Sequence, residues 1–101
     1  MLMLGFGGIY VEVNPDVALS PVPLDRDAAA ALRDRLAGRA LLDGVRGEGP
    51  ADIDALVDLV VKLSLFAADH GEVIGELDLN PVLVHPKGQG VSVVDALLIK
   101  R

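Results

Sequence analysis

The chain has 101 residues, of which 51% are hydrophobic and 24% are charged. This composition is typical of a folded protein, and the length suits one compact domain over residues 1–101. An active site that needs two lobes must therefore take the second lobe from elsewhere. The formal charge of −6 and the nine scattered Lys and Arg residues argue against a nucleic-acid groove.

The chain has no cysteine. This excludes disulfides, thiolate zinc sites and a cysteine nucleophile, and it suits a reducing cytoplasm. The apolar runs are far shorter than a membrane span, and residues 1–5 carry no basic group ahead of their apolar side chains. We therefore expect a cytoplasmic protein with no membrane contact. High apolar content in a small domain also predicts exposed apolar area, and hence a homo-oligomer or another partner.

The first part of the chain predicts a β-hairpin and a short helix. β-branched and aromatic residues make 9–13 a strand, residues 14–16 (NPD) a turn, and 17–19 the returning strand, which prolines then end. Asp25 is placed to cap a helix that stops at Gly38.

The second part predicts one long helix and two strand segments. Apolar residues follow helical spacing over 52–69, after a glycine-rich loop at 39–49. Strand patterns over 73–85 and 91–99 flank a turn at 86–90. The order ββααββ predicts an α+β fold in which two helices pack on a largely antiparallel sheet.

The long helix carries more apolar residues than one narrow seam requires. Val61, Leu65 and Phe66 widen its apolar side. This pattern indicates either burial over a wide face or an interface with a partner.

A group of oxygen-bearing side chains is the strongest chemical signal. Glu76, Asp78 and Asn80 alternate with apolar residues, so in a strand they project from one face. A hairpin around 88–90 brings Asp95 opposite the Asp78–Asn80 end. Carboxylate and amide oxygens of this kind suit Mg²⁺, with water and phosphates completing its shell. The alternative is a structural polar network in which Asn80, before a proline, is only a turn residue.

Four motifs occur in order along the chain: residues 5–13 (GFGGIYVEV), 44–47 (GVRG), 76–82 (ELDLNPV) and 93–96 (VVDA). Together they resemble the C-terminal part of the ATP-grasp domain of NDP-forming acetyl-CoA and acyl-CoA synthetases, and of related lysine acetyltransferases. The resemblance implies the ATP-grasp C-terminal subdomain fold. It also implies that Asn80 and Asp95 are magnesium ligands, with Asp78 and Glu76 as auxiliary acidic positions.

The resemblance further implies a reaction and its partners. The family exchanges acyl-CoA, phosphate and NDP for acid, CoA and NTP through an acyl phosphate and a phosphohistidine, and its grasp domain holds ATP or ADP with Mg²⁺. The phosphohistidine matches neither His70 nor His85, which we interpret as structural or solvated. The N-terminal lobe that grips the nucleotide is absent, so we expect the chain to need that lobe or a CoA-binding subunit and to be inactive alone.

Four further positions are candidates for nucleotide binding. Backbone amides at Gly7 and Gly8 suit a phosphate contact, or simply a tight entry into the strand. Glu12 matches a family glutamate, or is a solvent-facing carboxylate. Arg46 matches a loop arginine whose planar fork suits phosphate or carboxylate, or forms a surface salt bridge.

One departure keeps a second class of function open. Leu97 stands where the family often has arginine after its Asp-Ala pair, which removes a cation suited to phosphate. This loss and the missing lobe favour the alternative of a truncated, non-catalytic interaction module. The presence of Asn80 and Asp95 favours the synthetase lobe.

Overall fold

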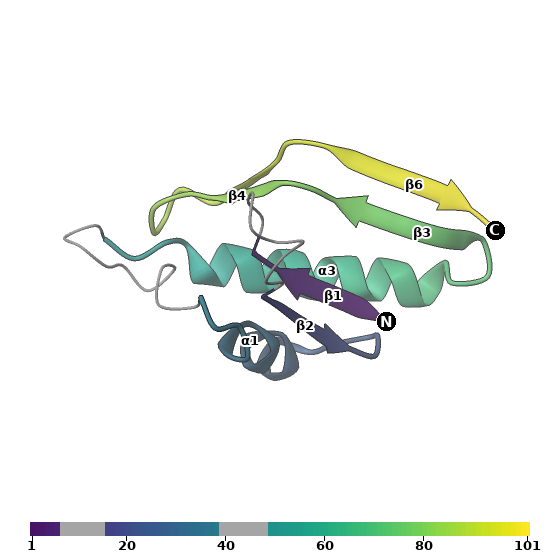
Figure 1. Ribbon diagram of the computed structural model, residues 1–101, viewed down its shortest axis with the longest axis horizontal. Coiled ribbons are helices and arrows are strands. Elements are labelled where there is room, and N and C mark those ends of the chain that lie inside the picture. Colours follow the sequence, from purple (N-terminus) through teal and green to yellow (C-terminus); the bar gives the residue numbers. More distant parts are fainter. Residues whose placement is uncertain (7–15, 39–48) are drawn as a thin grey trace.

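The computed structural model describes residues 1–6, 16–38 and 49–101. Within these residues the helices and strands follow one another as β1 (Leu2–Gly5), β2 (Val17–Ser20), α1 (Arg26–Asp34), α3 (Ile53–Asp69), β3 (Ile74–Leu79), β4 (Val82–Val84), β5 (Val91–Val93) and β6 (Ala96–Lys100). The strands form three two-stranded antiparallel sheets, β1–β2, β3–β6 and β4–β5. The predicted α+β fold of two helices with antiparallel strands is confirmed (Figure 1).

The N-terminal hairpin differs in part from the prediction. Residues 17–19 form a strand as predicted, but they pair with residues 2–5, for which no strand was predicted. Leu2 and Ala18 are buried on the inner face of this pair, which explains why the opening residues form a strand. Residues 2–5 do not alternate between apolar and polar side chains, which is the pattern that marks a half-buried strand, so the sequence did not indicate this strand. The predicted strand over 9–13 lies outside the described residues.

Helix α1 begins at the predicted cap and ends earlier than predicted. The Asp25 carboxylate accepts a 2.8 Å hydrogen bond from the third backbone N–H after it. The helix ends at Asp34 rather than at Gly38. The backbone N–H groups of Ala37 and Gly38 instead donate to the Asp16 carboxylate, each at 2.7 Å. These bonds tie the end of the helical segment to the residue before β2.

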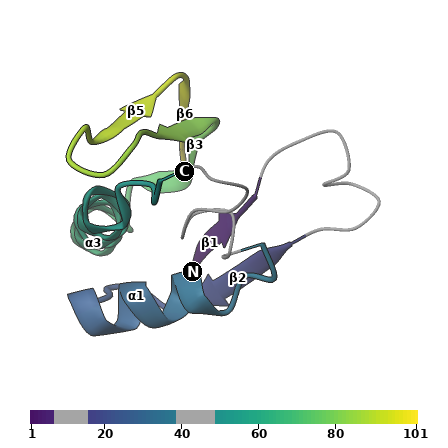
Figure 2. The ribbon, with the colours of Figure 1, turned by 90° about the vertical axis from the view of Figure 1, so that its left-hand side faces the viewer.

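The core lies between the two helices and the N-terminal hairpin. Its buried apolar residues are Leu2, Ala18, Leu24, Ala29, Leu32, Leu36, Leu56, Val57 and Val60. Ser64 is fully buried on the same stripe of α3, and its hydroxyl accepts a 2.9 Å hydrogen bond from the Leu24 N–H. Figure 2, which looks along α3, shows α1 beside it.

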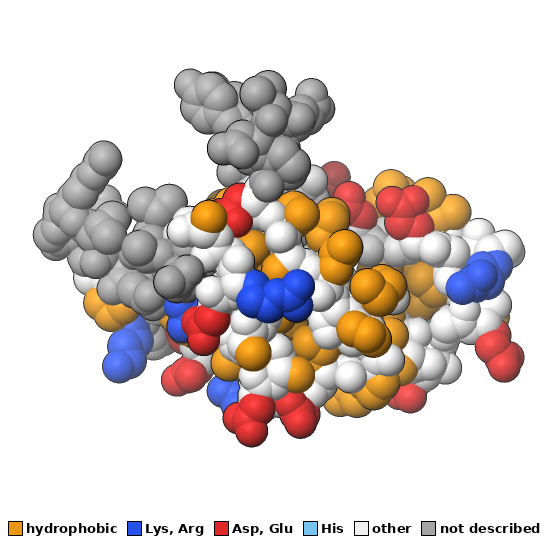
Figure 3. Space-filling view, turned by 60° about the horizontal axis from the view of Figure 1, so that its bottom comes forward, with side chains coloured by type: hydrophobic (Ala, Val, Ile, Leu, Met, Phe, Trp, Pro, Cys, Tyr) orange, Lys and Arg blue, Asp and Glu red, His pale blue; other side chains and the backbone are white. Residues whose placement is uncertain are grey.

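Helix α3 spans the predicted residues, but its wide apolar side is covered only in part, where Val61 packs against the core. Leu65 is 47% exposed and Phe66 is 43% exposed. Burial over a wide face is therefore wrong at this end of the helix. Other large apolar side chains are also exposed, and Figure 3 shows hydrophobic side chains grouped over the middle of one face. The predicted exposed apolar area is present, while the predicted homo-oligomer stays a prediction.

The C-terminal strands form one long hairpin that is interrupted in the middle. The predicted turn at 86–90 is confirmed, with β4 and β5 next to it and β3 and β6 further out. At the interruption the Asn80 N–H donates to the Asp95 carbonyl, and the Val94 N–H donates to the Pro81 carbonyl, both at 3.0 Å. Each predicted long strand is therefore two short ones.

Among the described residues, no helix is both long and apolar enough to cross a membrane.

Candidate metal and nucleotide site

The interruption in the long hairpin carries the predicted metal ligands. Asp78, Asn80 and Asp95 line one surface hollow of about 220 Å³, together with Ala96 and Leu97. Asp78 belongs to β3, Asn80 follows it directly, and Asp95 lies just before β6. The structure thus brings these three residues together as the hairpin predicts. Their role as metal ligands stays a prediction.

The strand pattern explains which way these side chains face. In β3, Leu77 and Leu79 are half-buried while Glu76 and Asp78 are exposed. Asp78 lies opposite Leu97, and Glu76 lies one further step away, opposite Ile99. Glu76 shares the face with Asp78 but is not among the residues that line the hollow. We therefore place Glu76 beside the site rather than in it.

The donor chemistry of the hollow fits a hard cation. Its described lining residues offer two carboxylates and one amide, and none of them is Lys, Arg or His. Mg²⁺ binds through one or two carboxylates and keeps several waters or phosphate oxygens. Over residues 1–6, 16–38 and 49–101, no three His, Cys, Asp or Glu side chains are grouped to hold a metal. An ion here would thus need the Asn80 amide, water and a phosphate ligand.

The size of the hollow suits a metal ion but not a whole nucleotide. At about 220 Å³ it is smaller than the 300–1,000 Å³ typical of small-molecule pockets. It is wide enough for a hydrated cation, and a whole nucleotide needs further walls.

The predicted nucleotide-binding positions Gly7, Gly8, Glu12 and Arg46 all lie outside the described residues.

The two histidines lie away from the hollow. His70 caps the end of α3, and its ring contacts that of Phe66 with centroids 4.6 Å apart. The His85 Nε2 atom lies 2.6 Å from the Ser92 hydroxyl across β4 and β5. Both arrangements agree with the structural interpretation of these side chains.

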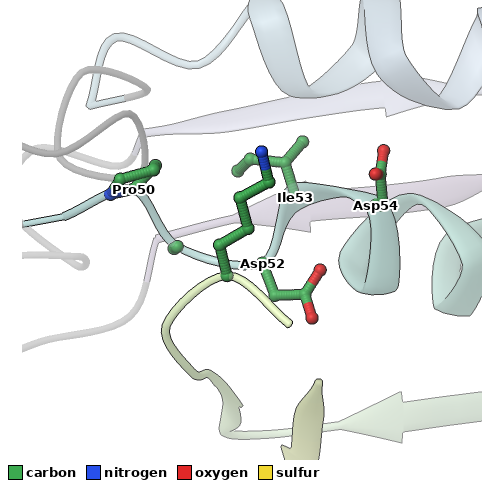
Figure 4. A pocket seen from close by; sticks show the side chains of 6 residues that line it. Pro50, Asp52, Ile53 and Asp54 are labelled. Carbon is green, nitrogen blue, oxygen red and sulfur yellow. The ribbon is translucent and has the colours of Figure 1, made fainter. Parts of the chain in front are cut away.

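Asp52 is an anchor that the sequence did not single out. It lines a second hollow with Pro50, Ala51, Ile53, Asp54 and Lys87 (Figure 4). It caps α3 through the Ala55 N–H at 3.2 Å, and it also accepts hydrogen bonds from the Gly88 and Gly90 N–H groups at 3.2 and 2.8 Å. One carboxylate therefore joins the start of α3 to the turn of the long hairpin. An Asp at the predicted start of a helix was the only signal.

The same contacts change how Asp52 titrates. The N–H donors of Gly90, Ala55 and Gly88, together with the charge of Lys87, hold the pKa of the Asp52 carboxyl below its ordinary value, although burial opposes them. The unfolded chain therefore takes up this proton at a higher pH than the folded chain. Asp52 stabilises the fold above the ordinary pKa of Asp, and this contribution is lost as the pH falls through the lowered value.

We expect Asp52→Asn to destabilise the fold at neutral pH, because the charge that these N–H groups stabilise is removed. The difference from the wild type should shrink as the pH falls below about 4, where a free Asp carboxyl becomes protonated. Urea unfolding at both pH values measures it. The control is Asp54→Asn, whose side chain is 87% exposed. If Asp52→Asn lowers the free energy of unfolding by the same amount at both pH values, Asp52 does not stabilise the fold through its charge.

Comparison with known proteins places this geometry in a family. The model of a family described as an ATP-grasp domain matches residues 1–99. The subunit beta of ADP-forming acetate–CoA ligase II from Pyrococcus furiosus is 43% identical over 98 residues, which cover 97% of this chain and 42% of that protein. ADP-forming acetate–CoA ligase I from Archaeoglobus fulgidus is 45% identical over 91 residues, or 90% of this chain and 13% of that protein.

Solved structures agree with the sequence relatives. A protein from Pyrococcus horikoshii Ot3 superposes with a TM-score of 0.92 at 39% identity, over 98% of this chain and 41% of the other. Dinucleotide-forming acetyl-coenzyme A synthetase 1 from Ca. Korarchaeum cryptofilum, in complex with coenzyme A and Mg-AMPPCP, gives a TM-score of 0.89 at 38% identity, over 98% and 45%. This chain spans less than half the length of these relatives. The resemblance inferred from the four motifs is confirmed: the chain belongs to the ATP-grasp domain family, and its relatives there include ADP-forming acetate–CoA ligases.

Proposed function

We propose that this chain supplies the magnesium and nucleotide-phosphate side of an ADP-forming acyl-CoA ligase. The observation that carries the proposal is the convergence of Asp78, Asn80 and Asp95 on one hollow. The ligase as a whole would convert acyl-CoA, ADP and phosphate into the acid, CoA and ATP. Phosphoryl transfer of this kind depends mainly on alignment and charge neutralisation, which a metal held by oxygen ligands supplies.

The roles of the side chains follow from their positions. Asp95 and Asn80 would hold Mg²⁺ from the two strands of the hairpin, and Asp78 would add negative charge next to them. Phosphate groups are repelled by two carboxylates, and the described residues that line the hollow include no cationic side chain to attract them. The ion would therefore be what makes this surface attractive to a nucleotide. Ala96 and Leu97 give the hollow an apolar wall.

The chain would need a partner to do this work. Its hollow is too small for a nucleotide, and the relatives are more than twice as long. We propose that the rest of an ATP-grasp domain closes over the hollow, that a CoA-binding domain or subunit completes the enzyme, and that the chain alone is inactive. The relative solved with coenzyme A and Mg-AMPPCP, which is a longer protein, supports this arrangement.

A second function rests on a different observation. Leu97 lies in the hollow with its side chain exposed, and several other apolar residues of the C-terminal hairpin are exposed elsewhere on the surface. A truncated grasp lobe that has lost nucleotide chemistry and acts as an interaction module would also present such a surface.

Calorimetric titration with Mg-ADP distinguishes the two. We expect little binding by this chain alone and clear binding once the complementary part of the P. furiosus subunit is added as a separate polypeptide. The complementary part alone is the control. If the mixture forms a complex that binds Mg-ADP no better than that control, the interaction-module function replaces the synthetase lobe.

A further inference from the structure

In the part of the chain that the structure describes, strand β6 has an unpaired edge, and its side chains are exposed. Among the described strands it pairs only with β3. All five of its residues are exposed, and Leu97, Leu98 and Ile99 are 53%, 52% and 45% exposed. Figure 1 shows β6 along the upper margin of the molecule, with β3 on its inner side. A hydrophobic strand at a sheet edge is a template for pairing with another strand.

The backbone shows which residues offer their hydrogen-bonding groups at this edge. The Asp95 carbonyl accepts the Asn80 N–H, and the Arg101 N–H donates to the Val73 carbonyl, so both residues direct backbone groups toward the β3 side. Successive residues of a strand alternate in this direction. Ala96, Leu98 and Lys100 therefore direct their N–H and C=O groups outward, to the free edge.

We propose that two copies of this chain pair antiparallel through β6, with Leu98 at the two-fold axis. This register sets Ala96 opposite Lys100 of the second copy, so that the outward backbone groups meet. It also sets Leu97 opposite Ile99, so that exposed apolar side chains cover one another. An edge-to-edge pair of this kind uses the same patch on both copies and closes on itself.

The charges at the two ends of the strand favour this register, and they favour a second copy of the chain as the partner. With Leu98 at the axis, Asp95 lies opposite Arg101 of the second copy, and symmetry gives this pair twice. Asp95 and Arg101 lie on the same face of the strand because their positions differ by an even number, six. The Arg101 side chain is held at the strand end, where its Nε atom donates to the Gly71 carbonyl at 2.8 Å. Two chains of net charge −6 repel each other, so pairing needs such opposite charges in contact.

Sedimentation velocity over a range of concentrations tests the surface. We expect the wild-type chain to dimerise, and Leu98→Lys to raise the dissociation constant about tenfold or more, because each dimer would place two charges at the axis. Leu83→Lys is the matched control, because Leu83 is 49% exposed on β4 and lies off the edge. Circular dichroism confirms that each variant folds. A strictly monomeric wild type, or equal loss of dimer in both variants, would overturn the proposal.

Exchange of the charges tests the register without touching the apolar residues. Arg101→Asp places like charges opposite each other twice and should weaken the dimer about tenfold. Adding Asp95→Arg to the same chain restores opposite charges in reversed order and should recover most of the affinity. If the double variant is as weak as Arg101→Asp, the proposed register is wrong. Asp95 also lines the proposed metal site, so the measurement is made without Mg²⁺ and nucleotide, where its result does not depend on whether Mg-ADP binds.

Discussion

Leu32→Ala should lower the free energy of unfolding by about 3 kcal/mol, since truncating a buried Leu costs about 2–5 kcal/mol. Leu32 is 2% exposed on α1 and belongs to the core that includes Leu56, Val57 and Val60 of α3. The cavity would open between the two helices, where little else can fill it. A domain of this size is stable by about 5–15 kcal/mol, so the loss is a large share of the total. Urea unfolding followed by circular dichroism measures it.

The matched control is Leu65→Ala in α3. It removes the same atoms from a side chain that is 47% exposed and replaces them with the best helix former, so the expected loss is about 1 kcal/mol or less. Equal losses for the two variants would show that the core does not lie between α1 and α3.

The helices could be predicted from the sequence because their signals are local. Asp25 and Asp52 lie at the helix starts, and the apolar spacing of α3 matches its buried residues. The end of α1 could not be predicted, because it depends on Asp16, a residue distant in the chain whose carboxylate takes the N–H groups of Ala37 and Gly38. Local signals fix where a helix begins, and tertiary contacts decide where this one ends.

Polar groups inside the fold were harder to predict than apolar ones. Ser64 lies on the buried stripe of α3, but the hydrogen bond that its hydroxyl accepts from the Leu24 N–H can be seen only in the folded structure. Asp52 likewise reads as a helix cap, while its contacts with Gly88 and Gly90 depend on the hairpin folding back. To predict such a role one must know which residue the polar group contacts, and a hydrophobicity pattern does not give that residue.

The candidate site was predictable to the extent that it depends on strand alternation and hairpin register. These two features brought Asp78, Asn80 and Asp95 to one hollow. They also placed Glu76 on the same face, but distance along β3 leaves it outside the lining residues. Alternation predicts the face that a side chain occupies, and only the interruption of the hairpin defines where on that face a site forms.

That distinction gives the sharpest test of the metal assignment. Asp95→Asn keeps the size of the side chain and removes one of the two carboxylate charges that line the hollow. Loss of groups that only support a metal ligand costs about 10–100-fold in affinity, so loss of a charged ligand should weaken Mg-ADP binding about 100-fold. The measurement is calorimetric titration of this chain mixed with the complementary part of the P. furiosus subunit.

Glu76→Gln is the matched control, because it also removes one negative charge, from a residue of β3 that lies on the face of Asp78 but outside the hollow. We expect it to weaken Mg-ADP binding only a few-fold, through the general loss of negative charge near the ion. Repeating both titrations with ADP and no Mg²⁺ should remove the loss caused by Asp95→Asn, because without the ion the Asp95 carboxylate only repels the phosphates and its neutralisation no longer weakens binding. Equal effects of Asp95→Asn and Glu76→Gln would mean that the hollow contributes only long-range charge. The magnesium assignment would then fail, and the interaction module would account better for this chain.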